Sequence, residues 1–360
     1  MHIGINARTF LTDEPGGAVQ TAIKIAKRLA ERDDVEVTLY GSKNLKNAWP
    51  NNVSIRGFGY PNKINFFGVI WERSVLPALA SRDDIDILLC PNGNAPMTPV
   101  NCPIITYIHD INAQKGMSSG VHQIYRRLLV PQGVKVSNKI ITVSEFSKRE
   151  IQKHLPVHSS DIHAIYNGVD DYYLNNKEGV EYELPEEYIL YVGSMNPRKN
   201  ISNLIKSFNI FKDKIDSNYK LVLIGPGNKY IFKKIDMVED GSDIITPGFV
   251  SQPELKYIYK NASLFAYISK YEGFGLPPLE AMACGTPVVA SESTSLPEVL
   301  NGAAAFVDPE EEVEIADKFL EVVSNKDVRN KLQRDGLQHV QSYTWESTID
   351  KLLAIFEDVK

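Results

Sequence analysis

The residues best suited to chemistry are two glutamates, Glu272 and Glu280, which stand eight positions apart in the run YEGFGLPPLEAMACG. Pro277 and Pro278 suit the first turn of a helix, where a missing N–H costs nothing, and Gly285 suits the position just past its end. This pattern predicts Glu280 in the first turn of the helix and Glu272 on the loop before it. Because the N–H groups at such a helix start attract anions, a ligand bound there would meet both carboxylates.

The two carboxylates would contact different parts of a ligand. Glu280 could accept hydrogen bonds from vicinal hydroxyls, as an acidic residue does toward a ribose in dinucleotide-binding folds. Glu272 and the loop amides would face the other end. The loop amides are those of Gly273, Phe274, Gly275 and Leu276. A plain helix-capping loop, with one exposed acid and one acid favoured by the helix dipole, is the alternative that the residue types leave open.

Two adjacent cations, Arg198 and Lys199, form the second candidate group. They follow the strand-like run YILYV and the turn GSMNP, and they precede a helical pattern. Two cations and helix N–H groups at one point can bind a diphosphate without a metal and can stabilise the charge that develops as it leaves. Exposed turn cations without a ligand are the alternative.

Three more places follow or precede predicted elements at positions that ligands use. Gly16 and Gly17 precede a helical pattern and would let backbone approach a ligand, although an ordinary loop turn has the same composition. His109 directly follows the apolar run IITYI, and a single histidine at a strand end is often structural or exposed. Ser144 is predicted first as a helix N-cap, with acceptor contact as the second interpretation.

The order of elements predicts an α/β fold with two doubly wound parallel-sheet domains. Strand-like apolar runs alternate with helical patterns throughout, and 360 residues exceed the usual size of one core. We place the first domain at residues 1–165, a polar linker at 166–187, the second domain at 188–344 and a last helical segment at 345–360. Ligands of open parallel sheets bind at the carboxyl ends of strands, where Arg198, Lys199 and His109 are expected.

Composition points to a soluble globular protein in a reducing compartment. Hydrophobic residues make up 43% and charged residues 23%, the apolar runs are strand-length, and the N-terminus already has a strand pattern rather than a signal peptide. Three cysteines without a metal or redox spacing favour the cytoplasm. Residues 1–165 carry 19 Lys+Arg against 14 Asp+Glu, whereas the remainder carries 20 against 31. A basic first half suggests that the protein binds an anionic surface or an anionic substrate.

The run EGFGLPPLEAMACGTPVV is similar to the Glu-x7-Glu motif of retaining glycosyltransferases of family 4, whose two Rossmann-like domains face each other across a cleft in the GT-B arrangement. The resemblance implies that Glu280 binds the ribose hydroxyls of a nucleotide sugar and that Glu272 lies against the donor sugar. It also implies that Lys199 and Arg198 bind the diphosphate. Many members have an arginine directly after the glycine, where this chain has Ser194, so Lys199 is the firmer assignment of the two.

The same resemblance assigns roles in the first domain. His109 would bind and orient the donor sugar rather than act as a base, and the loop of Gly16 and Gly17 would reach the donor phosphates or the acceptor. The catalytic set is then His109, Glu272 and Lys199. The final helix, 345–360, would cross back to the first domain, which the sequence alone leaves open.

The implied activity is metal-independent transfer of a hexose with retention, without a cofactor and by front-face attack, because no covalent nucleophile is evident. The runs VGSMNPRKN and SLPEVL look most like bacterial mannosyltransferases that build surface polysaccharide. This suggests GDP-mannose as donor and a glycan or lipid-linked glycan as acceptor, with no nucleic acid partner. A UDP-sugar donor, a glycosidase, a GT-B-like epimerase or phosphorylase, and a noncatalytic nucleotide-sugar-binding protein are the alternatives.

Three further patterns bear on this assignment. Asp84 and Asp86 form a D-x-D, a metal-binding pattern in other glycosyltransferases, but they precede their strand and so belong at the amino end of the sheet. No G-x-G-x-x-G follows the first strand, which counts against a nicotinamide dehydrogenase. The segment 121–136 interleaves apolar and basic residues. This pattern predicts either a helix with an ordinary solvated face or a helix that contacts the inner face of an anionic membrane peripherally.

Overall fold

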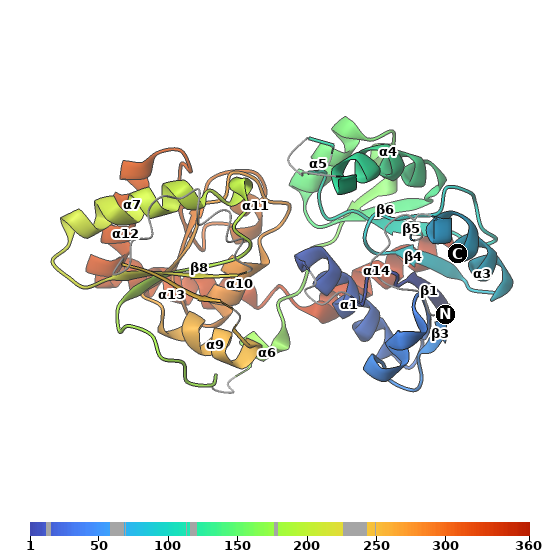
Figure 1. The fold of residues 1–360 in the computed structure, drawn as a ribbon, viewed down its shortest axis with the longest axis horizontal. Coiled ribbons are helices and arrows are strands. Elements are labelled where there is room, and N and C mark those ends of the chain that lie inside the picture. Colours follow the sequence, from blue (N-terminus) through green and yellow to red (C-terminus); the bar gives the residue numbers. More distant parts are fainter. Residues whose placement is uncertain are drawn as a thin grey trace. The chain divides into compact units, whose positions relative to one another are not determined.

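The chain forms two compact units, each built on its own parallel sheet (Figure 1). The computed structural model describes residues 1–11, 16–57, 68, 70–112, 114–115, 121–175, 179–225, 243–248 and 250–360. The first unit comprises Met1–Gly168 and Trp345–Lys360, and the second comprises Val169–Thr344.

The described part of the first unit contains a seven-stranded sheet in the order β3-β2-β1-β4-β5-β6-β7, with every neighbouring pair parallel. The strands are β1 (His2–Asn6), β2 (Glu36–Tyr40), β3 (Ser54–Arg56), β4 (Ile87–Cys90), β5 (Ile104–Tyr107), β6 (Lys139–Thr142) and β7 (Ile162–Ala164). The helical segments are α1 (Gly17–Ala30), η1 (Lys43–Ala48), η2 (Trp71–Val75), α3 (Leu76–Arg82), α4 (Val121–Val136), α5 (Glu145–His154), η3 (Ser159–Asp161) and α14 (Trp345–Val359).

Strand and helix formation in this unit follows from burial. The central strands β4 and β5 are fully buried along their length, which explains why they appear in the sequence as continuous apolar runs rather than as alternating ones. Helix α5 begins as predicted, because the Ser144 hydroxyl accepts a hydrogen bond from the Ser147 amide at 3.0 Å.

The last helix, α14, belongs to the first unit although it ends the chain. The Thr348 hydroxyl donates to the Tyr166 carbonyl at 2.8 Å, and Asp350 pairs with Arg32, just after α1, at 3.2 Å. Figure 1 shows α14 beside α1. The chain thus leaves the first unit near Gly168 and re-enters it at Trp345.

The described part of the second unit contains a six-stranded sheet in the order β10-β9-β8-β11-β12-β13, also parallel throughout. Its strands are β8 (Tyr188–Val192), β9 (Lys220–Ile224), β10 (Ile244–Gly248), β11 (Leu264–Tyr267), β12 (Val288–Ser291) and β13 (Ala305–Val307). Its helical segments are α6 (Asp171–Leu174), η4 (Pro197–Lys199), α7 (Ile201–Lys214), α9 (Gln252–Asn261), α10 (Leu276–Ala283), α11 (Leu296–Leu300), α12 (Glu312–Ser324) and α13 (Lys326–Val340).

Most of the segment expected as a linker, residues 166–187, is part of the second unit from Val169 onward. Tyr173 is buried and packs edge-to-face on Tyr259, with ring centroids 5.9 Å apart. The buried Lys256 ammonium donates to the carbonyls of Tyr172 and Asn175, each at 2.7 Å. These contacts anchor α6 to α9, whereas the described residues 179–187 that follow form no helix or strand.

Both sheets are doubly wound, as predicted, and each has one point where the strand order reverses. In the first unit the reversal lies between β1 and β4, and in the second it lies between β8 and β11. Ligands of open α/β sheets bind beside the carboxyl ends of the strands at such a point. A ligand site is therefore expected at one of the two reversal points.

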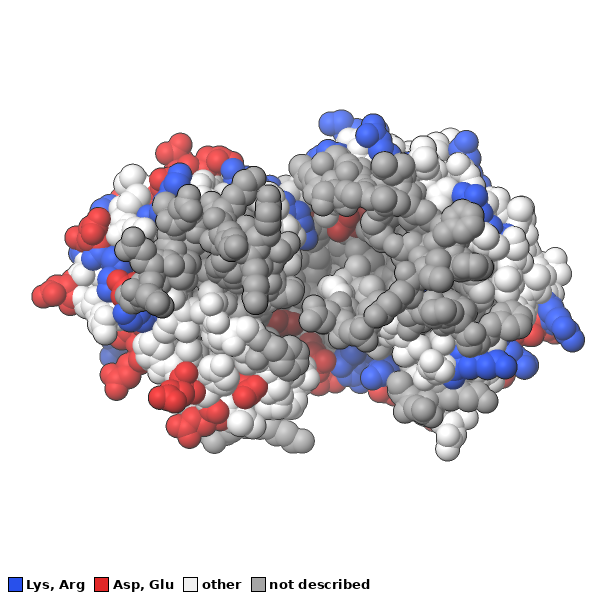
Figure 2. Space-filling view, in the orientation of Figure 1, with Lys and Arg blue, Asp and Glu red and all other residues white. Residues whose placement is uncertain are grey.

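The charge difference between the two halves is visible on the surface. On the face drawn in Figure 2, acidic side chains gather over the second unit, and Lys and Arg predominate over the first. The numbers of charged residues in the two halves of the sequence agree, with an excess of basic residues in the first half and of acidic residues in the second.

Candidate active site

The loop that carries Glu272 ends at a glycine that the backbone requires. Gly275 is the N-cap of α10 and has φ +101°, and a Cβ added there would lie 2.6 Å from a Leu296 methyl carbon. A residue with a side chain would be strained at that angle and would also clash. At the other end, the Gly285 amide (φ +79°) donates to the Met282 carbonyl at 3.0 Å, which is the predicted end of the helix.

The predicted position of Glu280 in the first turn of this helix is wrong. Helix α10 begins at Leu276, so the two prolines are its second and third residues and Glu280 is the fifth. Gly275 sets the start of the helix through its backbone angle, one residue earlier than the prolines suggest. Glu280 therefore lies in the second turn, where the helix dipole favours a carboxylate less.

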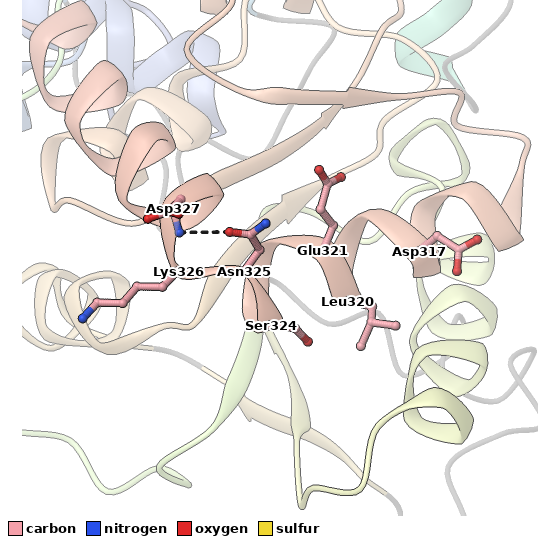
Figure 3. A pocket seen from close by; sticks show the side chains of 7 residues that line it. All are labelled: Asp317, Leu320, Glu321, Ser324, Asn325, Lys326 and Asp327. Carbon is pink, nitrogen blue, oxygen red and sulfur yellow. Dashed lines mark hydrogen bonds between the residues drawn. The ribbon is translucent and has the colours of Figure 1, made fainter.

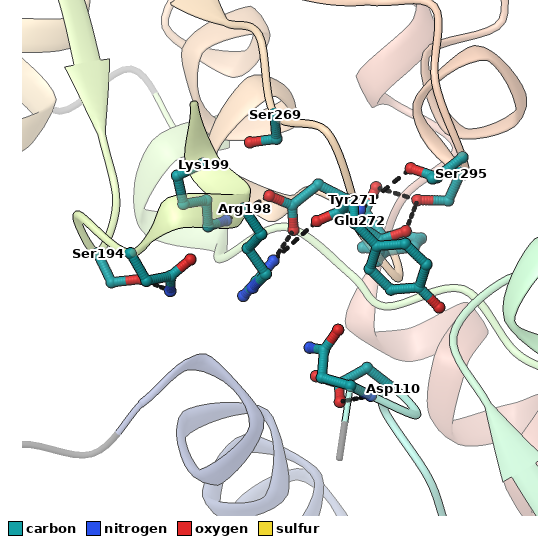
Figure 4. Close-up of polar contacts among 12 residues, drawn as sticks. Asp110, Ser194, Arg198, Lys199, Ser269, Tyr271, Glu272 and Ser295 are labelled. Carbon is teal, nitrogen blue, oxygen red and sulfur yellow. Dashed lines mark hydrogen bonds and ion pairs between the residues drawn. The ribbon is translucent and has the colours of Figure 1, made fainter. Parts of the chain in front are cut away.

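Glu272, Lys199 and Arg198 form one ionic cluster at the reversal point of the second sheet (Figure 4). The Lys199 ammonium hydrogen-bonds to Glu272 Oε1 and donates to the Tyr267 hydroxyl at 2.6 Å. The Arg198 guanidinium donates to Glu272 Oε2 at 3.0 Å and to the Tyr271 carbonyl at 2.9 Å. The cations come from η4, just after β8, and the carboxylate comes from the loop after β11.

This cluster is largely shielded from solvent. The side chains of Lys199 and Glu272 are each 7% exposed, whereas that of Arg198 is 24% exposed. Burial alone would raise the pKa of the Glu272 carboxyl, but the charges of Lys199 and Arg198 outweigh it and hold that pKa below its ordinary value. Glu272 is therefore ionised at neutral pH, and it neutralises the cations that the sequence suggested for a diphosphate.

Two residues that the sequence did not single out fix the shape of the Glu272 loop. The buried Ser295 hydroxyl donates to the carbonyls of Glu272 and Phe274, at 3.0 and 3.3 Å (Figure 4). The Thr294 hydroxyl oxygen accepts from the Glu272 amide at 3.1 Å, and Thr294 has φ +60°. A threonine in the left-handed region is uncommon and is found where surrounding contacts hold it.

Glu280 has surroundings of its own, which include Tyr259 in α9 and the carboxylate of Asp170, the N-cap of α6. It is half-buried, and its Oε2 accepts a hydrogen bond from the buried Tyr259 hydroxyl at 3.0 Å. Burial raises the pKa of Glu280 to about 7, the charge of Asp170 adds to the rise, and the Tyr259 hydrogen bond opposes it. Glu280 can thus gain or lose a proton near neutral pH.

Two predicted site groups lie in the first unit. Gly16 is the N-cap of α1 at φ −64° and Gly17 is its first residue, and a Cβ at either would meet no described atom within 4 Å. Neither backbone angle nor crowding among the described residues therefore requires glycine there. His109, at the carboxyl end of β5, is buried, and its ring stacks on Tyr107 with centroids 4.7 Å apart. Its Nε2 lies 2.9 Å from the Pro91 carbonyl, so that nitrogen carries the proton. Contact of His109, Gly16 or Gly17 with a ligand stays a prediction.

A separate depression in the second unit does not suit an anionic ligand. It has a volume of about 540 Å³ and lies where α12 meets α13 (Figure 3). Asp317, Glu321 and Asp327 line it with a single lysine, Lys326. Because α12 follows β13, its end lies at the amino edge of the parallel sheet, away from the Glu272 cluster. Its carboxylates would repel a diphosphate.

The described residues contain no group of three or more His, Cys, Asp or Glu side chains placed to bind a metal. The D-x-D residues lie before β4, as predicted, and Asp86 accepts from the His2 amide at 2.7 Å and pairs with the Lys360 ammonium at 2.8 Å. The expectation of a metal-independent reaction without a cofactor stays a prediction.

Two family models match successive parts of the chain. Residues 15–172 match the model "Glycosyltransferase Family 4", and residues 175–339 match the model "Glycosyl transferases group 1". The O-antigen chain mannosyltransferase B of Escherichia coli is 34% identical over 218 residues, which are 58% of this chain and 57% of that protein. The O-antigen chain mannosyltransferase RfbU of Salmonella typhimurium is 34% identical over 57% of this chain and 56% of its own length. The match thus spans a little over half the length of these relatives.

Solved structures share the fold at low sequence identity. The sucrose-phosphate synthase of Thermosynechococcus elongatus has a TM-score of 0.79 and 17% identity, with coverage of 99% of this chain and 98% of that one. HepE of Anabaena, solved in complex with UDP-glucose, has a TM-score of 0.75 and 18% identity, with coverage of 99% and 100%. At this identity, the likeness establishes the fold and leaves the ligand to other evidence.

Proposed function

The chain belongs to the glycosyltransferases of family 4, and from that premise we propose that it transfers a hexose from a nucleotide sugar to a glycan or lipid-linked glycan. The observation that carries the proposal is the ionic cluster of Glu272, Lys199 and Arg198 at the reversal point of the second sheet. Two cations, a carboxylate and a glycine loop at one sheet edge match the diphosphate, the sugar hydroxyls and the leaving charge of such a donor.

Each candidate site residue of the second unit has a proposed role toward the donor. Glu280 accepts hydrogen bonds from the ribose hydroxyls, and Lys199 and Arg198 bind the diphosphate. As the bond between the sugar and the phosphate breaks, negative charge grows on the departing diphosphate, and the two cations stabilise it. The amides of residues 273–276 and Glu272 hold the donor sugar. Holding these groups in place before the reaction lowers its barrier, because little reorganisation is needed when the charge appears.

The existing ion pairs imply an exchange of partners when a donor binds. Lys199 and Arg198 are paired with Glu272, so a diphosphate must take over these cations at the expense of the carboxylate. Glu272 would then be a nearly buried anion in need of donors, and the hydroxyls of the donor sugar can supply them. A donor that carries both a diphosphate and a sugar satisfies all three side chains.

The proposed donor is GDP-mannose and the proposed stereochemical course is retention. The O-antigen mannosyltransferases that match over part of the chain support mannose, and family membership supports retention by front-face attack. In that course the acceptor hydroxyl attacks from the side that the diphosphate leaves, and a diphosphate oxygen assists removal of the acceptor proton. Carbon-13 NMR of the product anomeric carbon distinguishes retention from inversion.

A transfer assay tests the proposed function. Protein is incubated with GDP-[14C]mannose and with membrane lipid and polysaccharide fractions as acceptors, and label in the acceptor is counted. Transfer by the wild type that is lost in Lys199→Met and in Glu280→Gln supports the proposal. Near-normal transfer in both variants would contradict the site assignment, and absence of transfer from GDP-mannose, UDP-glucose and other nucleotide sugars would contradict the function.

Peripheral contact with an anionic membrane is a further proposal for helix α4. Arg127 and Lys135 are exposed on this helix, and the Leu128 side chain between them is 61% exposed, whereas Val130 and Val134 are buried in the core. Among the described residues, no helix is both long and apolar enough to cross a membrane. Flotation with phosphatidylglycerol vesicles tests the contact: reduced binding of Leu128→Ser supports it, and protein that stays wholly unbound refutes it.

A further inference from the structure

Thr294 has a backbone conformation that threonine rarely adopts. The described residues other than glycine that have a positive φ are Asp84, Asn200, Thr294 and Asn301. Aspartate and asparagine tolerate this conformation, because their short polar side chains can hydrogen-bond locally, whereas a β-branched residue at φ +60° is a steric outlier. Such an outlier persists only where surrounding contacts hold it, and outliers of this kind cluster at functional sites.

In this conformation the Thr294 hydroxyl joins two backbone groups. Its oxygen accepts a hydrogen bond from the Glu272 amide at 3.1 Å, and its proton is donated to the Ser293 carbonyl at 2.8 Å. A hydroxyl has one proton to donate, so these two bonds fix its orientation. Thr294 follows β12 and Glu272 follows β11, which are neighbouring parallel strands. The hydroxyl therefore links the segments at the carboxyl ends of these two strands.

Glu272 is held at its amide, its carbonyl and its carboxylate. The amide donates to the Thr294 hydroxyl oxygen, and the carbonyl accepts from the Ser295 hydroxyl at 3.0 Å. The carboxylate pairs with Lys199 and Arg198 (Figure 4). The two hydroxyls come from the segment after β12 and the two cations from η4, so different elements position the backbone and the side chain of Glu272.

Stability alone favours glycine at position 294. Glycine adopts a positive φ without steric cost, as Gly275 does at φ +101° on the loop of Glu272. A threonine at φ +60° therefore keeps strain that a glycine would remove. What glycine lacks is the hydroxyl, and here that hydroxyl binds the Glu272 amide. The contact with Glu272 thus accounts for a threonine at this angle, whereas a turn with a purely structural role does not require one.

We infer that Thr294 is a positioning residue for the transfer reaction: its hydroxyl fixes the backbone of Glu272 and so sets where that carboxylate meets the donor sugar. The inference rests on the proposed function, which assigns Glu272 to the sugar. Misplacement by about 1 Å of a group that orients a substrate can lower a rate about 100-fold. Lys199 and Arg198 keep their places on η4, so binding of the diphosphate does not depend on Thr294.

Three substitutions at Thr294 separate its hydroxyl from its backbone strain. Thr294→Ser keeps the hydroxyl, Thr294→Ala loses it and keeps the strain, and Thr294→Gly loses both. Asn301→Gly is the matched control, because Asn301 is an exposed left-handed residue (φ +39°) at the other end of α11. The unfolding temperature of Thr294→Gly should stay within about 2 °C of the wild type, because relief of strain offsets the lost hydrogen bond.

The kinetic test measures transfer at saturating GDP-mannose. Thr294→Gly and Thr294→Ala should lower kcat about tenfold or more, whereas Thr294→Ser and Asn301→Gly should stay within about twofold of the wild type. The affinity for GDP, measured by calorimetry, should be unchanged in all four variants, because GDP carries the diphosphate and no sugar. A general disturbance of the fold would lower kcat, GDP affinity and the unfolding temperature together.

Hydrogen exchange read by mass spectrometry tests the contact itself, independently of any reaction. The Glu272 amide should exchange faster in Thr294→Gly and Thr294→Ala than in the wild type, and at the wild-type rate in Thr294→Ser and Asn301→Gly.

Three outcomes would overturn the inference alone. These are an unchanged exchange rate of the Glu272 amide in all variants, a normal kcat in Thr294→Gly and Thr294→Ala, and a kcat of Thr294→Ser as low as that of Thr294→Ala. Absence of transfer by the wild type from any nucleotide sugar would instead refute the proposed function, and this inference with it.

Discussion

Removal of Glu272 should destabilise the second unit more than removal of Lys199. In Glu272→Gln the Lys199 ammonium, only 7% exposed, keeps the Tyr267 hydroxyl and the Tyr267 ring 4.8 Å away but loses its carboxylate. Loss of one partner of a buried ion pair costs about 3–5 kcal/mol. In Lys199→Met, Glu272 keeps Arg198 at 3.0 Å and a methionine fills similar volume, so we expect about 1–3 kcal/mol.

The assay must report on the second unit, because all three tryptophans, Trp49, Trp71 and Trp345, lie in the first. Urea unfolding is therefore followed by circular dichroism and by calorimetry rather than by tryptophan fluorescence. The double variant Lys199→Met/Glu272→Gln should lose less stability than the sum of the single variants, because it leaves no lone buried charge. GDP should restore part of the stability of Glu272→Gln by supplying negative charge to Lys199. A larger loss in Lys199→Met than in Glu272→Gln would show that Lys199 does not depend on Glu272 for its charge compensation.

Four further predictions concern Glu280, Gly17 and Ser295. Folding raises the pKa of Glu280 from an ordinary 4.5 to about 7, so between these pH values the native state binds a proton that the unfolded state does not. The free energy of unfolding should therefore fall as pH rises from 4.5 to 7 and then level off. Glu280→Gln should remove this trend in urea titrations. If the ribose hydroxyls donate to the carboxylate, GDP-mannose affinity by calorimetry should rise roughly tenfold from pH 6 to pH 8 in wild type and stay flat in Glu280→Gln. Gly17→Ala should keep or raise the unfolding free energy, by up to about 1 kcal/mol, and yet lower transfer, whereas a variant with normal transfer would remove Gly17 from the site. Ser295→Ala should cost about 1–3 kcal/mol, because two loop carbonyls lose their donor, and should weaken GDP-mannose binding; unchanged binding would show that the loop holds its shape without it.

The fold and the sheet edge that carries Arg198, Lys199 and Glu272 could be predicted because they depend on local patterns. Continuous apolar runs mark strands that are covered on both faces, and the residues just after these strands must lie at the carboxyl edge of a parallel sheet. Arg198, Lys199 and Glu272 were found in this way, and they do lie together. The two family models and the shared fold of the solved structures agree with the predicted fold.

What could not be predicted depends on contacts between residues far apart in the chain. Glu272 pairs with Lys199, 73 positions away, and no local pattern indicates that pairing. Tyr259 and Tyr267 stand at positions that any buried aromatic residue of a helix or strand could occupy. The sequence therefore does not indicate that their hydroxyl groups contact Glu280 and Lys199. The left-handed backbone conformation of Thr294 could not be predicted, because glycine is the residue that normally marks such a position in a sequence.

The turn in which Glu280 lies was mispredicted for a related reason. Prolines are compatible with any of the first helical positions, so they leave the starting residue uncertain by one or more. The positive φ of Gly275 fixes the start instead, and the Leu296 methyl leaves no room for a side chain at that position.

The most direct test of the central claim is calorimetric titration of the protein with GDP-mannose. We expect saturable binding to the wild type. The affinity should be reduced at least about tenfold in Lys199→Met, where a charge-assisted contact to the diphosphate is lost, and in Glu280→Gln. Exposed Lys318→Met, in the same unit, should bind normally. Undiminished binding by Lys199→Met and Glu280→Gln, or no binding of any nucleotide sugar to the wild type, would contradict the claim that this sheet edge is the donor site.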